Sequence, residues 1–476
     1  MNTNKTKIIA TIGPSSNTKQ VLRRLISSGM NVARLNFSHG NYAEHEKVVR
    51  TIRSLSKEMN KSVGIFLDLQ GPKIRVGSLK EGKPVFLKKN ETVSITSRKI
   101  SGTSEIIPTT YTKLASDVKK GDKILLDDGL IELRVLSKTK DTVRCKIING
   151  GLLRQNKGIN LPGVDISSPS LTQKDKKDLV YGIELGVDYF ALSFVRSAKD
   201  LKIIKDIIKR LGSDIPVIAK IEKPEAVQDL DKILKATDAI MVARGDLGVE
   251  MRPEQVPKIQ KDIIYKAIKA NKPVITATQM LESMTDNPIP TRAEASDVAN
   301  AIYDGTDAIM LSGETALGKY PVKAVQMMKR IAIEAEASPF MKYNIHYEND
   351  NNDDIVTSAV AQSCVNILHE VGAKAIVTFS VSGKTSMIIS KRRPPRRVYA
   401  FSPSKRIYNR LSLVWGITPL LIPPINDTKR IIEAGEKIIV ENKSVKKNDL
   451  IVIVTGLALK KGSTNLIKIH RIGHDD

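Results

Sequence analysis

The sequence predicts an α/β protein built as a (β/α)8 TIM barrel, with a β-rich lid domain inserted after strand three and an open α/β domain at the C-terminus. Three observations support this prediction. Eight short apolar runs alternate with helical patterns, residues 70–187 interrupt this rhythm with short strand patterns, and the alternation resumes after a polar segment. The length of 476 residues fits about three domains.

The barrel strands are expected where short runs rich in Ile and Val end in polar residues. Such runs are too short for helices and are typical of buried parallel strands. Helical patterns lie between most of them, as in residues 18–29 and 198–212, where Gly29 and Gly212 are expected as C-caps. Eight units without a G-x-G-x-x-G turn favour a closed barrel over the alternative, a doubly wound open sheet. The runs are residues 7–13, 31–38, 63–69, 188–194, 216–222, 239–246, 273–279 and 308–314.

The inserted domain is expected at residues 71–168, which leaves 1–70 and 169–345 for the barrel. Its strand patterns are short, and Asp127-Asp128-Gly129 between KILL and LIEL is a hairpin signal. Loops at the carboxyl ends of barrel strands carry the chemistry, so an insertion there is placed to act as a lid.

The C-terminal domain is expected at residues 346–476 and begins after the polar run YENDNNDD, which is typical of a linker. A helical pattern at 355–372 is followed by strand patterns in AKAIVTFS, RVYAFS, ITPLLI and DLIVIVTG, with helical patterns between them. This alternation predicts a small open α/β domain.

Composition limits the class of protein. With 41% hydrophobic and 27% charged residues, the chain is typical of globular domains. Two distant cysteines, Cys145 and Cys364, favour a reducing, cytoplasmic setting. No apolar run reaches the length of a secretory h-region at the start or of a membrane helix elsewhere, so we expect no membrane association.

The formal net charge of +25 makes nucleic-acid binding an alternative function. Only 4% of residues are aromatic, and no nucleic-acid motif is present, so we expect no nucleic-acid partner. The surplus is better suited to collecting anionic substrates. The dense basic run at 391–397 is expected to cap a helix end or frame an anionic pocket.

Polar and charged residues occupy the predicted carboxyl ends of the barrel strands, where barrel active sites lie. Charges gathered there are costly unless they are paired or bind a ligand. Each residue alone could be a helix cap or a structural ion pair, but the whole set on one rim indicates an active site. The set is Arg34, Asn36, Ser38, Asp68, Ser193, Lys220, Glu222, Arg244, Asp246, Thr276, Thr278, Ser312 and Glu314.

Glu222 and Asp246 end adjacent strands, and two neighbouring carboxylates repel unless a cation lies between them. Their oxygens suit Mg²⁺, although salt bridges to Lys220 and Arg244 are an alternative. Lys220 lies on the same strand face as Glu222, where an ammonium could stabilise a phosphoryl group in transfer. Asn36, Ser38 and Asp68 form a second oxygen-rich group, and Arg34 could bind a phosphate.

The motifs along nearly the whole chain resemble those of the pyruvate kinase family. The resemblance implies the barrel, lid and C-terminal domain described above, and transfer of a phosphoryl group from phosphoenolpyruvate to ADP, giving pyruvate and ATP in the last step of glycolysis. It also implies a homotetramer. The chain is most similar to bacterial members that lack an extra C-terminal domain. The stretches are TKIIATIGPSS, GMNVARLNFSHG, LDLQGPKIRVG, GINLPG, AKIEKPEAV, MVARGDLGVE, TATQMLESM, PTRAEASDVANA and DGTDAIMLSGETA.

The same resemblance implies roles for individual residues. Lys220 would stabilise the transferring phosphoryl group, and Glu222 with Asp246 would bind Mg²⁺ or Mn²⁺. The remaining substrate-binding residues would be Arg34 at the phosphate, with Ser193, Phe194, Arg244, Gly245 and Thr278 around the rest of the substrate. Thr278 lies near the protonated enolate carbon, and Ser312 with Glu314 would support a water chain for that proton. The nucleotide would face Pro14, Asn36, Ser38, His39, Arg75 and Lys157.

One motif departs from many family members. Those members bind K⁺ with residues matching Asn36, Ser38, Asp68 and the carbonyl of the next residue, and they read D-T-K-G-P-E. This chain has Leu69 after Asp68 and Lys73 in place of the glutamate, as in members that do not need K⁺. The Lys73 ammonium could supply the missing charge, so K⁺ is expected to be dispensable.

A loop in the C-terminal domain resembles the family's sugar-phosphate effector loop. A strand runs into hydroxyl residues, a glycine and a lysine before a helix, and a helix N-terminus of this kind suits a phosphate. We therefore expect a sugar-phosphate or nucleotide effector, with a plain helix cap as the alternative. The loop residues are Thr378, Ser380, Ser382, Gly383, Lys384 and Thr385.

A barrel aldolase or lyase that uses Lys220 as a Schiff base is the alternative enzyme class. Such a lysine needs a lowered pKa. The neighbouring Glu222 and Asp246 carboxylates favour the charged ammonium and so count against this alternative.

Overall fold

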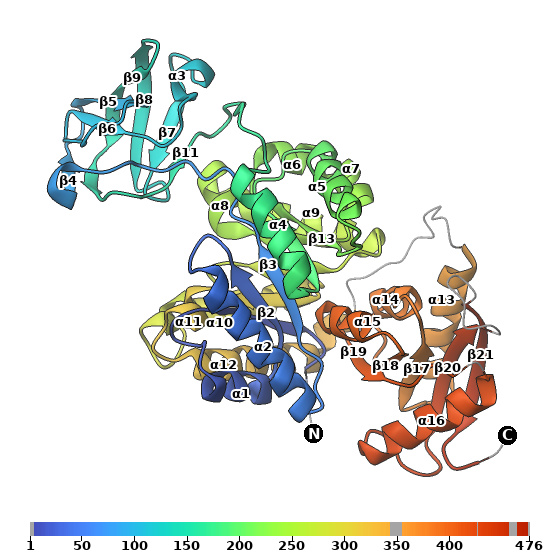
Figure 1. The fold of residues 1–476 in the computed structure, drawn as a ribbon. Helices are drawn as coiled ribbons and strands as arrows, with labels where there is room; N and C mark the ends of the chain where they lie inside the picture. The colour runs from blue at the N-terminus through green and yellow to red at the C-terminus, as the bar shows by residue number, and fades with distance from the viewer. Residues whose placement is uncertain (1–3, 343–354, 426, 457–463, 475–476) are drawn as a thin grey trace.

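Eight parallel strands form a closed barrel (Figure 1). The computed structural model describes residues 4–342, 355–425, 427–456 and 464–474. Neighbours around the barrel run β1-β16-β15-β14-β13-β12-β3-β2, which confirms the predicted barrel and rules out the open doubly wound sheet. The strands are β1 (Lys7–Ile12), β2 (Met30–Asn36), β3 (Gly64–Asp68), β12 (Tyr189–Leu192), β13 (Val217–Ile221), β14 (Ala239–Ala243), β15 (Val274–Ala277) and β16 (Ala308–Leu311).

Helices surround this barrel and begin and end at recognisable caps. Thr18 caps the first helix by accepting a hydrogen bond from Val21 N, and Gly29 ends it with a φ of 123°. Gly212 is not itself the C-cap of the fifth helix: Leu211 is, and Gly212 follows with a φ of 72°. The barrel helices are α1 (Lys19–Ser28), α2 (Tyr42–Glu58), α4 (Gln173–Leu185), α5 (Ala198–Arg210), α6 (Pro224–Gln228), α7 (Leu230–Ala236), α8 (Arg244–Glu250), α9 (Val256–Lys269), α10 (Arg292–Tyr303), α11 (Gly313–Ala316) and α12 (Pro321–Ala337).

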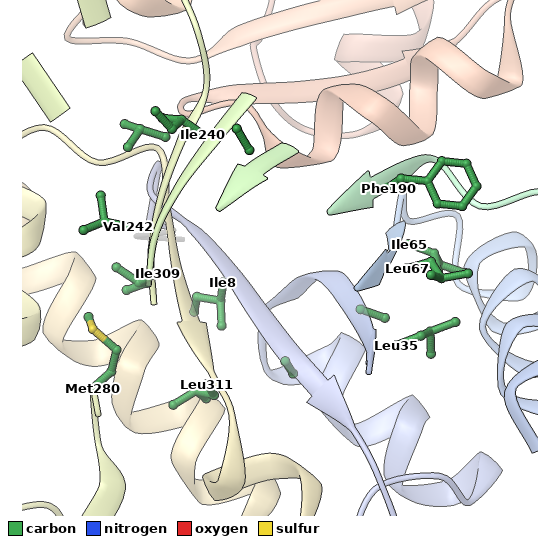
Figure 2. Close-up of a cluster of buried hydrophobic side chains, with 14 of the residues drawn as sticks. Ile8, Leu35, Ile65, Leu67, Phe190, Ile240, Val242, Met280, Ile309 and Leu311 are labelled. Carbon is green, nitrogen blue, oxygen red and sulfur yellow. The ribbon is translucent and has the colours of Figure 1, made fainter. Parts of the chain in front are cut away.

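Alternate residues of each barrel strand serve two apolar layers. On β1, Ile8 packs in the layer between strands and helices, whereas Ile9 packs inside the barrel. Figure 2 shows part of the outer layer, including Ile8, Leu35 and Phe190. The interior therefore has no pore, and the polar residues lie at the strand ends.

The inserted domain follows β3 and is an antiparallel-rich β unit with its own apolar cluster. The predicted hairpin is present: β7 and β8 pair antiparallel across a turn in which Asp127, Asp128 and Gly129 all have positive φ. Its elements are β4 (Val85–Leu87), β5 (Thr92–Thr96), β6 (Ile106–Pro108), α3 (Leu114–Asp117), β7 (Lys123–Leu126), β8 (Ile131–Lys138), β9 (Thr142–Asn149), β10 (Gly151–Leu153) and β11 (Ile159–Asn160).

The C-terminal α/β unit contains a five-stranded sheet in the order β19-β18-β17-β20-β21. The last strand, β21, pairs antiparallel with β20 and was not among the predicted strands. Apolar and polar residues alternate from Ile467 to His470, which is the signal for this strand. The elements are α13 (Ile355–Glu370), β17 (Ala375–Phe379), α14 (Lys384–Lys391), β18 (Val398–Ser402), α15 (Lys405–Arg410), β19 (Ile417–Leu421), α16 (Thr428–Glu441), β20 (Leu450–Gly456) and β21 (Thr464–Arg471).

The C-terminal unit packs on the end of the barrel where the strands begin. Gly416 N donates to Lys5 O (2.9 Å), and the hydroxyl of Tyr189, the first residue of β12, donates to Arg410 O (2.9 Å). In Figure 1 the inserted domain lies on the other side of the barrel. The carboxyl ends of the strands therefore face away from the C-terminal unit.

The basic run at 391–397 helps to form this joint. Lys391 and Arg393 both contact Asp307, the residue before β16, and the Arg393 guanidinium lies 4.6 Å from the Trp415 ring centre. Neither helix capping nor an anionic pocket accounts for these two residues. Their partner is a barrel carboxylate that is distant in sequence.

Both cysteines are free and buried. In the part of the chain that the structure describes, no helix is both long and apolar enough to cross a membrane.

Candidate active site

Arg34 and Asp68 stand at the ends of the neighbouring strands β2 and β3. Arg34 donates from Nε to Asp68 Oδ2 (2.8 Å) and from Nη1 to Thr11 Oγ1 (3.1 Å). Burial alone would raise the pKa of Asp68, but the Lys220 ammonium and the Arg34 guanidinium hold it below its usual value. Asp68 is therefore an anion that orients two cations at the rim.

Lys220, on β13, contacts three other side chains of the site. Its Nζ lies 2.7 Å from Glu222 Oε1 and 3.4 Å from Asp68 Oδ1, and it donates to Ser193 Oγ (2.7 Å). Burial would lower the pKa of Lys220, but Asp68 and Glu222 raise it above its usual value. A lysine held as an ammonium is unsuited to Schiff-base chemistry, which removes the physical basis for the aldolase alternative.

Glu222 and Asp246 follow the adjacent strands β13 and β14, as predicted. Glu222 Oε2 accepts a hydrogen bond from Phe194 N (2.7 Å), and the buried Oε1 lies 2.7 Å from the Lys220 ammonium. Burial and the nearby Asp246 carboxylate raise the pKa of Glu222, and Lys220 opposes this rise. A buried carboxylate next to a second carboxylate fits a divalent cation, because the two like charges repel without one.

Of the two salt bridges predicted as the alternative for this pair, only the one to Lys220 is present. Lys220 does pair with Glu222, but Arg244 turns away from both carboxylates and pairs with Asp297 (2.7 Å). In the described residues no cluster of three or more His, Cys, Asp or Glu side chains could hold a metal. A cation bound by Glu222 and Asp246 would need further oxygens from water or substrate.

Thr278 has a backbone conformation that is strained for a β-branched residue, with a φ of 69°. The turn is held by Arg244, whose Nη2 donates to Thr278 O (2.8 Å), and by Gly245 N, which donates to Thr278 Oγ1 (2.7 Å). A Cβ at Gly245 would lie 3.3 Å from that hydroxyl. These contacts fix the Thr278 hydroxyl beside the start of α8, near Asp246.

Glu314 is fully buried and holds two loops together. Its carboxylate accepts hydrogen bonds from Leu281 N (3.1 Å) and Ser312 N (2.6 Å). Burial raises the pKa of Glu314. The Ser312 hydroxyl is buried and makes no hydrogen bond to the described residues.

Most of the oxygen atoms predicted to bind a monovalent cation already interact with protein donors. Asn36 Oδ1 accepts from Ser38 N (3.1 Å), and Leu69 O accepts from Ser193 Oγ (2.8 Å). Asp68 is already contacted by two cations. Lys73 lines the cleft between the inserted domain and the barrel, together with Phe194 and Asp246.

The predicted nucleotide residues are only partly brought together. Burial lowers the pKa of His39, and the nearby Arg75, Lys73 and Arg34 lower it further, so these cations gather near one imidazole. Lys157 is paired with Asp127 in the inserted domain (2.8 Å). Pro14 is exposed after β1, and Thr276 is turned elsewhere, with its hydroxyl donating to Thr306 Oγ1 (3.0 Å).

Three residues outside the predicted set connect the inserted domain to this site. Glu250 Oε1 accepts hydrogen bonds from Asn160 Nδ2 in β11 (2.9 Å) and from Lys223 Nζ (2.6 Å). Lys223 directly follows Glu222, and Glu250 lies one helical turn after Asp246. The position of Glu250 in MVARGDLGVE was a usable signal, but its partners could be found only in three dimensions.

The residues of the expected effector loop are engaged with one another and with neighbouring residues. The hydroxyls of Thr378 and Ser386 lie 2.7 Å apart, Ser380 Oγ accepts from Gly383 N (2.9 Å), and the Thr385 hydroxyl contacts that of Thr464. Ser382 and Lys384 flank Gly383 at the start of α14. This arrangement is compatible with an effector and with a helix cap.

Comparison with known proteins matches both the barrel region and the C-terminal region of the chain to the same family. Residues 3–325 match the pyruvate kinase barrel domain, and residues 358–470 match the pyruvate kinase alpha/beta domain. Curated pyruvate kinases from Staphylococcus epidermidis and Staphylococcus saprophyticus are 45% and 46% identical to the chain, over 99% of it and 81% of their own length. A crystal structure of a pyruvate kinase from Cryptosporidium parvum superimposes with a TM-score of 0.92 at 37% identity, covering 99% of this chain and 96% of that one.

Proposed function

Because this chain belongs to the pyruvate kinase family, we propose that it transfers the phosphoryl group of phosphoenolpyruvate to ADP, giving pyruvate and ATP. The observation that carries the proposal is the Lys220 ammonium, held 2.7 Å from the Glu222 carboxylate at the carboxyl ends of the barrel strands. Phosphoryl transfer needs positioned cations more than covalent help from the protein.

Arg34 and Lys220 bind the phosphoryl group in this proposal. Asp68 contacts both cations, so their approach is set before substrate arrives. Preorganised donors of this kind stabilise charge on the transferring group without reorganisation during the reaction. Ser193 supports Lys220 by accepting its hydrogen bond, and Phe194 N fixes Glu222.

Glu222 and Asp246 would hold the divalent cation, Mg²⁺ or Mn²⁺, and the buried Glu222 carboxylate beside that of Asp246 supports this assignment. When bound, such an ion supplies positive charge for the substrate's oxygens. The backbone at Arg244 and Gly245, with the Thr278 hydroxyl, contacts the carboxylate end of phosphoenolpyruvate. Thr278 lies near the carbon that is protonated after transfer, and Ser312 with Glu314 supports a water chain that supplies the proton.

The inserted domain, residues 71–168, acts as a lid in this proposal, and barrel residues 1–70 and 169–345 carry the chemistry. Closure excludes water and so protects the phosphoryl group from hydrolysis. Asn36, Ser38, His39, Arg75, Lys157 and Pro14 face the nucleotide. K⁺ is dispensable, because protein donors already engage Asp68 and the Leu69 carbonyl.

Residues 346–476 form a regulatory domain, and the loop from Thr378 to Thr385 binds a phosphorylated effector. The enzyme acts in the cytoplasm as a homotetramer. These assignments follow from the family resemblance and extend the reaction proposed above.

The direct test is a lactate-dehydrogenase-coupled assay with phosphoenolpyruvate, ADP and Mg²⁺, run with and without K⁺. We expect pyruvate formation that requires both substrates and the divalent cation. Absence of pyruvate under all these conditions would remove the proposed activity. A shift of the half-saturating phosphoenolpyruvate concentration on adding sugar phosphates or nucleoside monophosphates tests the effector loop.

A further inference from the structure

The two carboxylates proposed to hold the divalent cation are held in place in different ways. The Glu222 carboxylate accepts a hydrogen bond from Phe194 N (2.7 Å) and lies 2.7 Å from the Lys220 ammonium. The Asp246 carboxylate, in the first turn of α8, forms no ion pair and accepts no hydrogen bond among the residues that the structure describes. The place of Asp246 relative to Glu222 therefore depends on where α8 lies.

An ion pair fixes α8 against the segment that follows β13. Lys223 directly follows Glu222 and donates from Nζ to Glu250 Oε1 (2.6 Å). Glu250 ends α8, one helical turn after Asp246. The side chains of Lys223 and Glu250 are only 7% and 1% exposed. Burying such a pair costs desolvation, and its best-supported use is to specify one arrangement of the chain. Here that arrangement places the two carboxylate-bearing segments side by side.

The inserted domain reaches the same helix. Asn160 Nδ2, in β11, donates to Glu250 Oε1 (2.9 Å), the oxygen that also accepts from Lys223. The other oxygen, Oε2, is buried and accepts no hydrogen bond from the described parts of the chain. At the turn between β7 and β8, a Cβ at Gly129 would lie 3.8 Å from the Val249 side chain. The Glu250 carboxylate is thus held by two donors, one from the barrel and one from the inserted domain.

We propose that Glu250 is a positioning residue for the divalent-cation site. This inference rests on the cation site proposed above at Glu222 and Asp246. Through Lys223, Glu250 sets the spacing of the two carboxylates, and through Asn160 the inserted domain acts on the same spacing. Replacing residues that orient metal ligands without binding the metal typically changes metal affinity by about 10–100-fold.

The test is titration of the full chain with Mn²⁺, without phosphoenolpyruvate or ADP, followed by the electron paramagnetic resonance signal of the free ion. The variant is Lys223→Met/Glu250→Gln, which removes the ion pair and leaves the net charge unchanged. Methionine fills a similar volume, and glutamine keeps an oxygen that can accept from Asn160, so the variant should fold. The control is Arg53→Met, which breaks the ion pair with the buried Asp188 (2.7 Å) at the end of the barrel where the strands begin.

We expect the double variant to bind Mn²⁺ at least about tenfold more weakly than the wild type. The control should lose thermal stability, because Asp188 stays buried without its cationic partner, but it should keep the wild-type affinity for Mn²⁺. A second variant, Asn160→Ser, leaves the ion pair in place and removes the donor from the inserted domain. It should weaken Mn²⁺ binding by at least about fivefold, the lower end of typical coupling between two sites.

Unchanged Mn²⁺ affinity in the folded double variant or in Asn160→Ser would overturn this inference and leave the proposed reaction intact. An equal loss of affinity in Arg53→Met would also overturn it, because lower stability alone would then explain the effect. If the wild type bound no Mn²⁺, the cation site on which both proposals rest would be wrong. Binding is measured without turnover, so none of these results depends on the coupled assay.

Discussion

Lys391 Nζ contacts the Asp307 carboxylate in an ion pair whose two side chains are fully buried. Lys391 ends α14 in the C-terminal unit, and Asp307 precedes β16 of the barrel. Burial lowers the pKa of Lys391 to about 8, and although burial would raise the pKa of Asp307, Lys391 and Arg393 hold it below its usual value. The pair therefore links two units through a contact that is costly to break from one side.

We expect Lys391→Met to destabilise the joint between the units by about 3–5 kcal/mol, because it leaves the Asp307 carboxylate buried with a weaker partner. The measurement is urea unfolding followed by the fluorescence of Trp415, the one tryptophan of the chain. Trp415 N donates to Asp307 Oδ1 (3.4 Å), so the probe lies at the joint.

The matched control for this variant is Arg406→Gln. Arg406 pairs with Asp214 across the same two units, but both side chains are more than half exposed. Exposed pairs contribute about 0–1 kcal/mol, so the control should stay near the wild type. An equal loss of stability in the two variants would contradict the importance of burial here.

Lys220→Ala should lower kcat by at least about 10²–10³-fold, the usual effect of removing one preorganised donor to a transition state. Circular dichroism and thermal unfolding should show that the variant remains folded. Near-normal turnover in a folded variant would remove Lys220 from its proposed role.

The Thr278 hydroxyl, rather than its methyl group, should be needed for turnover. Thr278→Ser keeps the Oγ that accepts a hydrogen bond from Gly245 N and reduces crowding at a positive φ, so it should retain most activity. Thr278→Ala should lose about 10²–10⁴-fold, as expected when a group that assists proton transfer is removed. Deuterium exchange into the methyl group of pyruvate, followed by NMR, isolates this step. Exchange as fast in the alanine variant as in the wild type would contradict the assignment.

Activity should be nearly unchanged when K⁺ is replaced by tetramethylammonium. The physical reason is that Lys73 supplies a charge near the site while protein donors engage Asp68 and Leu69 O. Lys73→Glu should create a requirement for K⁺, measured in the coupled assay. A large fall in the wild-type rate in tetramethylammonium would show that an inorganic cation is needed after all.

Asn160→Asp should loosen the contact between the inserted domain and the barrel. The new carboxylate would face the Glu250 carboxylate, and like charges in contact repel. We expect faster amide hydrogen exchange in β11 and a higher half-saturating substrate concentration. Asn149→Asp is the control, since it adds the same charge at an exposed position of the inserted domain. Identical exchange in the two variants would mean that the Asn160–Glu250 contact does not hold the domain.

Much of the architecture could be predicted from local patterns. The eight barrel strands were readable because each is a short run of buried residues, and the Asp127–Gly129 hairpin because its turn needs residues that tolerate positive φ. β21 was missed because an antiparallel edge strand lies outside the strand–helix rhythm.

For the site, strand ends alone predicted that Lys220, Glu222 and Asp246 lie together, because parallel strands of a barrel end on one rim. The sequence by itself thus determined the fold class, the rim and the charged residues on it. Only the tertiary structure decided which charge meets which: Arg244 with Asp297, Asn160 with Glu250, and Lys391 with Asp307. Those pairings depend on distances between atoms that are far apart in the chain. Hydrophobic periodicity carries no information about these distances.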